Sequence, residues 1–324
     1  MQQTVTELLK PIGGYIELQL PQKEEYYPSL IKLNAGRNCL EYILRIKGYQ
    51  NVFLPYFTCD VLLEPIQNLG IKHTFYHIDK NLDPIIDFEI GEKDCMVYTN
   101  YFGLKQRTVS KLSNRIANLI IDNSQAFFSH PIPKIDTFYS CRKFFGVPDG
   151  AYLQLNSKKR LDLTKDISIN RFSHLIKSID LSIEDGYNDY VQNNLDFNHK
   201  SVKKMSSLTQ KILASIDYED CIKRRNVNFA FLHHFLESYN ELDLDFFETD
   251  APQVYPLLIL KRNLKQQLIG RKIYVPTFWP NVFTWADSSM FEYNLSQNLI
   301  ALPIDHRYNL DDMTRMLNVL NQLL

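Results

Sequence analysis

Short apolar runs alternate with amphipathic stretches along the first two thirds of the chain. Between the runs, residues 37–48 and 59–70 carry apolar residues at helical spacing and end on glycine. The runs rich in strand-forming residues cover 51–57, 72–78, 94–102, 118–125, 136–140 and 150–156. Strands that alternate with helices predict a mainly parallel sheet sandwiched by helices, so we expect an α/β fold.

The pattern changes after residue 157. Residues 157–216 are helical and polar, with an amphipathic helix within 201–216. The rest predicts a helix over 221–239, a strand over 253–261, a short strand within 270–282 and a helix over 310–324. A chain of 324 residues is long for one core. We therefore predict a large α/β domain over 1–215 docked to a small α+β domain over 216–324.

Composition narrows the class of protein. Hydrophobic residues make up 45% of the chain, and no apolar run reaches the roughly 18 to 20 residues of a membrane span. Residues 1–15 lack a basic segment followed by an apolar stretch, so we predict a cytoplasmic protein. The five scattered cysteines fit neither a disulfide framework nor a zinc site, and we interpret them as reduced thiols.

The net charge and the spacing of the histidines argue against nucleic acid and metal ions as partners. The formal net charge is -1 and no basic stripe is present, which argues against nucleic-acid binding and favours a small-molecule ligand. The eight histidines lack metal-ligand spacing with matching carboxylates, so we predict no metal site.

Two positions at predicted strand and helix ends are candidates for ligand binding. Ala35-Gly36 precedes a predicted helix that starts around Arg37, whose free amides and dipole suit a phosphate, although an ordinary glycine turn has the same pattern. Asp122 directly follows an apolar run, where a buried carboxylate needs a cationic or N–H partner. The alternative for Asp122 is a cap on a following helix.

A lysine among aromatic residues is the third candidate. Ser140 and Lys143 form a Ser-x-x-Lys at the end of a predicted strand, with Tyr139, Phe144 and Phe145 close by in the chain. Aromatic surroundings would lower the pKa of the Lys143 amine and free it to attack a carbonyl. Ser-x-x-Lys also occurs in acyl-transfer enzymes, whose accompanying motifs are missing here, and a surface lysine has the same local sequence.

Taken in order, these motifs resemble those of the fold type I pyridoxal-phosphate enzymes, most closely the DegT-type sugar aminotransferases. The matching segments are Ala35-Gly36-Arg37, Asp122-Asn-Ser-Gln125, and Lys143 with the following FFGVPDGA. The resemblance implies that Lys143 forms the Schiff base with pyridoxal phosphate and moves the substrate proton.

The resemblance also implies roles for the other residues of the predicted site. Asp122 would face the pyridine nitrogen, and Gln125 would lie by the ring or its 3-hydroxyl. Ser140 and the backbone of Gly36 and Arg37 would hold the phosphate. Either Phe57 or Cys59 would cover the ring, and the sequence leaves that choice open.

The activity implied is that of an aminotransferase in a homodimer. It would move an amino group from an amino-acid donor to a keto-sugar, nucleotide-linked in this family, or to a similar acceptor, in polysaccharide or secondary metabolism. Two alternatives remain: another reaction with the same cofactor, such as elimination, decarboxylation or racemisation, and a non-catalytic binding or regulatory protein. The aromatic residues Tyr274, Phe278, Trp279 and Trp285 could form a substrate wall or belong to the core.

Overall fold

The computed structural model describes residues 12–247 and 250–324. Most of the N-terminal stretch on which the cytoplasmic prediction depends, residues 1–11, lies outside the described residues. Within the described ranges, no helix is both long enough and apolar enough to cross a membrane.

In the part of the chain that the structure describes, seven strands form one sheet in the order β1-β7-β6-β5-β4-β2-β3. The strands β2 to β6 run parallel, β7 is antiparallel to β6, and β1 is antiparallel to β7. Their bounds are β1 Ile31–Leu33, β2 Asn51–Pro55, β3 Lys72–Tyr76, β4 Asp94–Thr99, β5 Leu119–Asp122, β6 Asp136–Ser140 and β7 Ala151–Gln154. The predicted α/β fold and its six strands are confirmed, and β1 was missed because three residues carry little periodicity.

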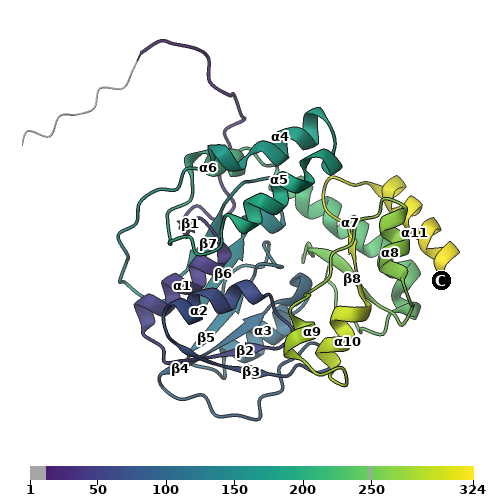
Figure 1. Ribbon diagram of the computed structural model, residues 1–324, viewed down its shortest axis with the longest axis horizontal. Coiled ribbons are helices and arrows are strands. Elements are labelled where there is room, and N and C mark those ends of the chain that lie inside the picture. The colour runs from purple at the N-terminus through teal and green to yellow at the C-terminus, as the bar shows by residue number, and fades with distance from the viewer. Residues whose placement is uncertain (1–11, 248–249) are drawn as a thin grey trace, which may run out of the picture.

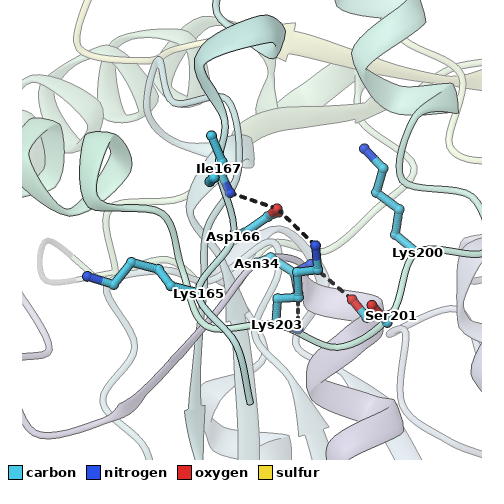
Figure 2. Close-up of a pocket in the computed structure, with 7 residues that line it drawn as sticks. All are labelled: Asn34, Lys165, Asp166, Ile167, Lys200, Ser201 and Lys203. Atoms are coloured by element: carbon cyan, nitrogen blue, oxygen red, sulfur yellow. Dashed lines mark hydrogen bonds and ion pairs between the residues drawn. The ribbon is translucent and has the colours of Figure 1, made fainter. Parts of the chain in front are cut away.

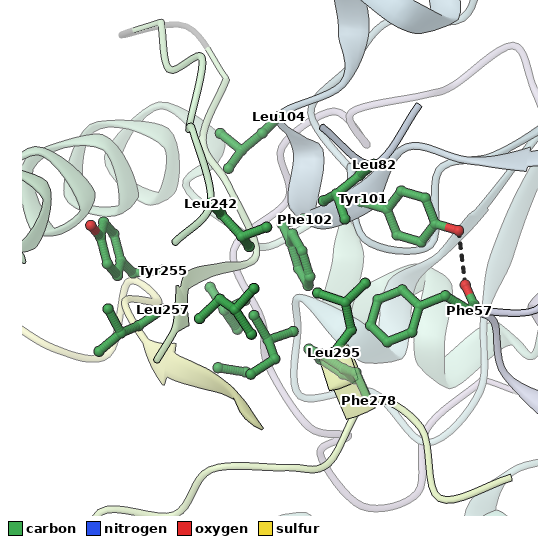
Figure 3. Close-up of a cluster of buried hydrophobic side chains, with 14 of the residues drawn as sticks. Phe57, Leu82, Tyr101, Phe102, Leu104, Leu242, Tyr255, Leu257, Phe278 and Leu295 are labelled. Carbon is green, nitrogen blue, oxygen red and sulfur yellow. Dashed lines mark hydrogen bonds between the residues drawn. The ribbon is translucent and has the colours of Figure 1, made fainter. Parts of the chain in front are cut away.

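Alternate residues of a strand point to opposite faces of a sheet. Consecutive strand residues here are apolar, so both faces of the sheet are apolar. On one face, the strands pack with α1 (Gly36–Lys47) and α2 (Leu63–Asn68) in a cluster that includes Val52 and Val97. On the other face, Phe53 and Met96 belong to a larger cluster that continues into the C-terminal lobe, part of which Figure 3 shows. The two lobes therefore share one core, and the boundary at residue 215 stays a prediction.

Helices surround the sheet and build the C-terminal lobe (Figure 1). The helix α7 (Tyr218–Leu236) and the helices of the lobe lie beside the sheet, whereas α4, α5 and α6 lie at one end of it. Besides α1, α2 and α7, the helices are α3 Gln106–Ser113, α4 Ser173–Asp180, α5 Ile183–Leu195, α6 Ser207–Leu213, α8 Leu264–Gly270, α9 Val282–Trp285, α10 Phe291–Asn298 and α11 Leu310–Leu323.

The C-terminal lobe differs from the prediction in its second strand. β8 (Val254–Leu258) pairs antiparallel with β9 (Leu299–Pro303), not with the short strand predicted within 270–282. That segment contains Pro276 and Pro280, which cannot donate ladder hydrogen bonds, and it has no strand in the structure. The strand prediction within 270–282 is therefore wrong, whereas the α+β class of the lobe is confirmed.

Candidate active site

The carboxyl ends of the parallel strands bring four sequence segments to one edge of the sheet. Asp122 is the last residue of β5 and pairs in register with Thr99, the last residue of β4. Ser140 ends β6, and a 3-10 turn over Cys141–Lys143 follows it directly. The segment after β2 carries Cys59 to the same edge, close enough for its thiol to interact with the charge of Lys143. Ligands of open α/β sheets bind at this edge.

Asp122 is buried at that edge, and few interactions stabilise the negative charge of its carboxylate. One carboxylate oxygen accepts a hydrogen bond from the backbone N–H of Ser124 at 2.8 Å. Burial raises the pKa of Asp122, while the hydrogen bonds from Ser124 and the positive charge of Lys143 oppose that rise. No helix begins after Asp122, so the alternative role as a helix cap is wrong and the carboxylate closes a turn instead.

The start of α1 forms a cradle with two serines from neighbouring strand ends. A Cβ built on Gly36 would lie 3.5 Å from the Oγ atom of Ser124 and 3.8 Å from the Cβ atom of Ser140. Ala35 precedes the helix without a side-chain cap, and the first turn contains no acidic residue. The start of α1, with its unpaired amides and the positive end of the helix dipole, therefore lies beside two serines and the ring of Phe138, and a helix start of this kind can bind phosphate. Ser124 was missed as a site residue although it lies between Asp122 and Gln125.

The guanidinium of Arg37 does not point into this cradle. Its Nη1 atom donates to Glu64 at 2.6 Å and to Asn198 at 3.0 Å. The sequence resemblance places only the Arg37 backbone at the phosphate, and the structure leaves that amide at the first turn of α1. The side-chain charge is matched by Glu64.

Gln125 is buried, and only one end of its side-chain amide has a protein partner. The Oε1 atom accepts a hydrogen bond from the backbone N–H of Phe102 at 3.0 Å. The Nε2 atom is buried and has no hydrogen-bond partner among residues 12–247 and 250–324. A buried donor without an acceptor is costly in a folded protein, so this atom is suited to a ligand acceptor.

Lys143 lies at the open side of the site, and its surroundings differ from the prediction. Its side chain is exposed, whereas Phe144 and Phe145 are buried in a third core cluster. Successive residues of a 3-10 turn point in different directions, so chain neighbours do not surround the amine. The expectation that Phe144 and Phe145 enclose Lys143 is wrong. The Nζ atom lies 6.0 Å from the centre of the Phe278 ring, which the C-terminal lobe supplies.

The two candidates for the residue that covers the ring, Phe57 and Cys59, differ in their burial. Phe57 is fully buried and packs against Tyr101 and Trp279, and its carbonyl accepts a hydrogen bond from the Tyr101 hydroxyl at 2.8 Å (Figure 3). Cys59 is partly accessible, and burial raises the pKa of its thiol while Lys143 opposes that rise. The charge of Lys143 thus acts on the Cys59 thiol, whereas Phe57 is enclosed by aromatic side chains.

The turn after Lys143 is held by a buried carboxylate that the sequence did not reveal. Asp149 accepts hydrogen bonds from the backbone N–H of Ser206 at 2.9 Å and from its hydroxyl at 2.7 Å, and also from the hydroxyl of Thr209. Gly150 has a φ of 117°, and a Cβ there would lie 2.9 Å from the side chain of Thr209. The start of α6 therefore fastens the turn that follows Lys143.

A separate hollow of about 310 Å³ lies beside Asn34 and contains none of the predicted site residues. Figure 2 shows Asp166 and Lys203 pointing toward one another across it, 3.9 Å apart. The same carboxylate binds Arg171 at 2.7 Å, so the buried acid of this hollow is already paired.

Comparison with known proteins gives matches in structure but not in sequence. No protein-family profile matches the chain, and no curated protein is similar to it in sequence. Solved structures match over most of the chain. An aminotransferase of the DegT/DnrJ/EryC1/StrS group from Brucella abortus has a TM-score of 0.61 at 14% identity, covering 90% of this chain and 85% of its own.

Two further structures give the same result. The sugar aminotransferase CalS13 from Micromonospora echinospora has a TM-score of 0.61 at 13% identity, with 91% of this chain and 87% of its own covered. NtdA from Bacillus subtilis, crystallised with bound PMP, has a TM-score of 0.63 at 12% identity, with 91% and 73% covered. At these identities the likeness shows the fold, which is that of these aminotransferases.

Proposed function

We propose that this chain is a pyridoxal-phosphate-dependent aminotransferase that moves an amino group from an amino-acid donor to a keto-sugar or similar acceptor. One observation carries the proposal. The buried Asp122 carboxylate, the Lys143 amine and the cradle at Gly36 converge at the carboxyl edge of one sheet. A likeness in fold to sugar aminotransferases supports it.

The residues present fit this cofactor at three points. The absence of a Cβ at Gly36 leaves the amides at the start of α1 open beside Ser124 and Ser140, so a phosphate would bind through these amides and the two hydroxyls. The Gln125 Nε2 donor has no partner in the described chain, as expected for a group that binds an acceptor on the ligand. The Asp122 carboxylate lacks a direct cationic contact in the described chain, so it suits a protonated ring nitrogen.

Each of these residues then has a role. Lys143 would hold the cofactor through its amine and move the proton at the substrate carbon. Asp122 would keep a proton on the ring nitrogen, and Gln125 would orient the ring through Nε2. Cys59 would exclude water from one face of the ring. When bound, the cofactor supplies an electron-withdrawing ring that stabilises negative charge at the substrate carbon.

The first experiment is a cofactor spectrum of the purified protein after incubation with pyridoxal phosphate. We expect a yellow protein whose absorbance near the visible edge is lost in Lys143→Ala and kept in Lys158→Ala, a change at an exposed lysine outside the site. A wild type that stays colourless after reconstitution would contradict the proposal.

A second experiment separates aminotransfer from other reactions of the same cofactor. Adding glutamate or another amino-acid donor in single turnover should bleach the visible absorbance, because the donor leaves its amino group on the enzyme. A yellow protein whose spectrum stays unchanged with every donor would favour another reaction or a non-catalytic role. We also propose a homodimer, on the strength of the resemblance in motifs.

A further inference from the structure

The C-terminal lobe contains a hollow of about 440 Å³ between the start of α8 and the junction of α10 with β9. Three cations line it, Lys261, Arg262 and Lys265, and none of the described residues adds a carboxylate to its wall. Its volume lies within the roughly 300 to 1,000 Å³ of small-molecule sites. We call it the lobe hollow, and its lining includes no residue of the candidate active site.

The positive charge of the lobe hollow is not neutralised by the part of the chain that the structure describes. Lys265 is half-buried, and its Nζ atom donates to two neutral acceptors, the carbonyl of Ser296 at 3.0 Å and the hydroxyl of Thr277 at 3.4 Å. Burial lowers the pKa of this amine to about 8, as expected for an ammonium group that has lost solvent without gaining a negative partner. Arg262 is exposed and forms no ion pair within residues 12–247 and 250–324.

Amide side chains make up most of the remaining wall. They belong to Asn263, Gln266, Gln297 and Asn298. Each amide has a donor end and an acceptor end, the combination that binds hydroxyl groups, whereas the Arg262 guanidinium offers paired donors that match phosphate oxygens. Among the described residues no aromatic ring lines the hollow, so it has no platform on which a nucleobase would stack.

We propose that the lobe hollow binds the phosphate ester of a small hydroxylated molecule, the chemistry of a sugar phosphate. The cations would bind the phosphate, and the amides would bind the hydroxyl groups. A nucleic-acid backbone would need a cationic stripe along the surface, whereas these charges lie in one hollow. The proposed site does not depend on the chemistry proposed for Lys143.

Lys265 also connects the lobe hollow with the candidate active site. Its amine donates to the hydroxyl of Thr277, and Thr277 directly precedes Phe278 in the chain. The centre of the Phe278 ring lies 6.0 Å from the Nζ atom of Lys143. A phosphate that binds the Lys265 amine would therefore act one residue away from a side chain that lies beside Lys143.

The test is a calorimetric titration of the full chain with glucose 6-phosphate at pH 7 and low salt, after incubation with pyridoxal phosphate. The cofactor would occupy the cradle at Gly36, the other place where we expect phosphate to bind. Arg262→Gln and Lys265→Met should each weaken binding of glucose 6-phosphate at least about tenfold. Arg271→Gln is the matched control and should bind normally, because Arg271 is an exposed arginine at the other end of α8, outside the hollow. Circular dichroism of each variant checks that it is folded.

A series of ligands tests the chemical class. Inorganic phosphate should bind at least about tenfold more weakly than glucose 6-phosphate because it lacks the sugar hydroxyls, and glucose alone should give no measurable heat. Equal affinities for inorganic phosphate and glucose 6-phosphate would overturn the proposal of a hydroxylated ester. No binding of glucose 6-phosphate, or binding that Arg262→Gln leaves unchanged, would overturn the site itself, and Arg262 is exposed, so this variant serves where Lys265→Met fails to fold. None of these results would alter the cofactor spectrum that tests the proposed function.

Discussion

The guanidinium carbon of Arg225 lies 4.5 Å from the centre of the Phe144 ring, and Phe144 directly follows Lys143. Arg225 is almost fully buried, and its Nη1 atom donates to the carbonyls of Pro252 at 3.0 Å and Gln253 at 3.1 Å. One side chain of α7 thus joins the lysine segment to the start of the C-terminal lobe.

From Gln253, hydrogen bonds lead to Gln125 on the opposite side of the candidate site. The backbone N–H of Gln253 donates to the carbonyl of Phe102 at 2.9 Å, and the N–H of Phe102 donates to Gln125 at 3.0 Å. Phe102 has a φ of 59°, and Gly103 has a φ of 84° with its backbone close against Gln125 and Pro252. Arg225 therefore supports both Lys143 and Gln125 without touching either.

Replacing Arg225 with methionine should destabilise the protein strongly. The change leaves two buried carbonyl oxygens without their donor, so the free energy of unfolding should fall by about 2 to 4 kcal/mol in urea titrations. Arg224→Met is the matched control, because Arg224 is half exposed and pairs with Asp220 on the same helix. Its effect should stay below about 1 kcal/mol. Equal effects of the two changes would contradict the supporting role of Arg225.

Gly36→Ala should separate cofactor binding from stability. The added Cβ meets ordinary van der Waals contacts, 3.5 Å from Ser124, so the free energy of unfolding without cofactor should change little. The same methyl group would stand between the start of α1 and the two serines, where we propose that the phosphate binds, so pyridoxal phosphate should bind at least about tenfold more weakly in a fluorescence titration. Gly146→Ala, where the nearest contact is also at 3.5 Å, is the control and should bind normally. Unchanged affinity in Gly36→Ala would place the phosphate elsewhere.

Asp122→Asn should show opposite effects on stability and activity. Burial holds the pKa of Asp122 above its ordinary value of 3.8. Between the ordinary pKa of the unfolded chain and the raised pKa of the folded chain, the unfolded chain has lost this proton while the folded chain keeps it. The stability of the folded protein therefore falls as pH rises through this range. Relative to wild type without cofactor, the asparagine variant should be at least as stable at pH 7 and lose that advantage at pH 4.

Activity of the same variant should fall about 100- to 1,000-fold, because the charge that would hold the ring proton is lost. Urea unfolding at pH 4 and pH 7, together with single-turnover kinetics, measures both effects. An asparagine variant that is less stable than wild type at pH 7 would show that the carboxylate is stabilising in the fold.

Asp149→Ala should loosen the turn after Lys143. The change removes the acceptor for the Ser206 amide and for the hydroxyls of Ser206 and Thr209. Losing the acceptor of three buried hydrogen bonds should lower the free energy of unfolding by about 3 to 5 kcal/mol. Asp162→Ala, at an exposed aspartate, should have almost no effect. A small effect of Asp149→Ala would mean that α6 does not hold this turn.

Much of the α/β domain could be predicted because its signals are local. The strands that end at Asp122 and Ser140 and the helix that begins at Gly36 follow from short-range periodicity and from glycine at a helix start. Strand order could not be predicted in this way. β9 pairs with β8 although some forty residues separate them along the chain, and no local pattern distinguishes that partner from the proline-containing segment between them.

Local sequence was enough to place a carboxylate and a lysine at strand ends and a glycine at a helix start, because side-chain alternation and element boundaries are properties of neighbouring residues. The directions of the side chains came from the tertiary structure. It buried Phe144 and Phe145 in the core, paired Arg37 with Glu64, and left Tyr187 of α5 facing solvent. These outcomes depend on contacts between segments far apart in the chain, which packing selects and local sequence does not encode.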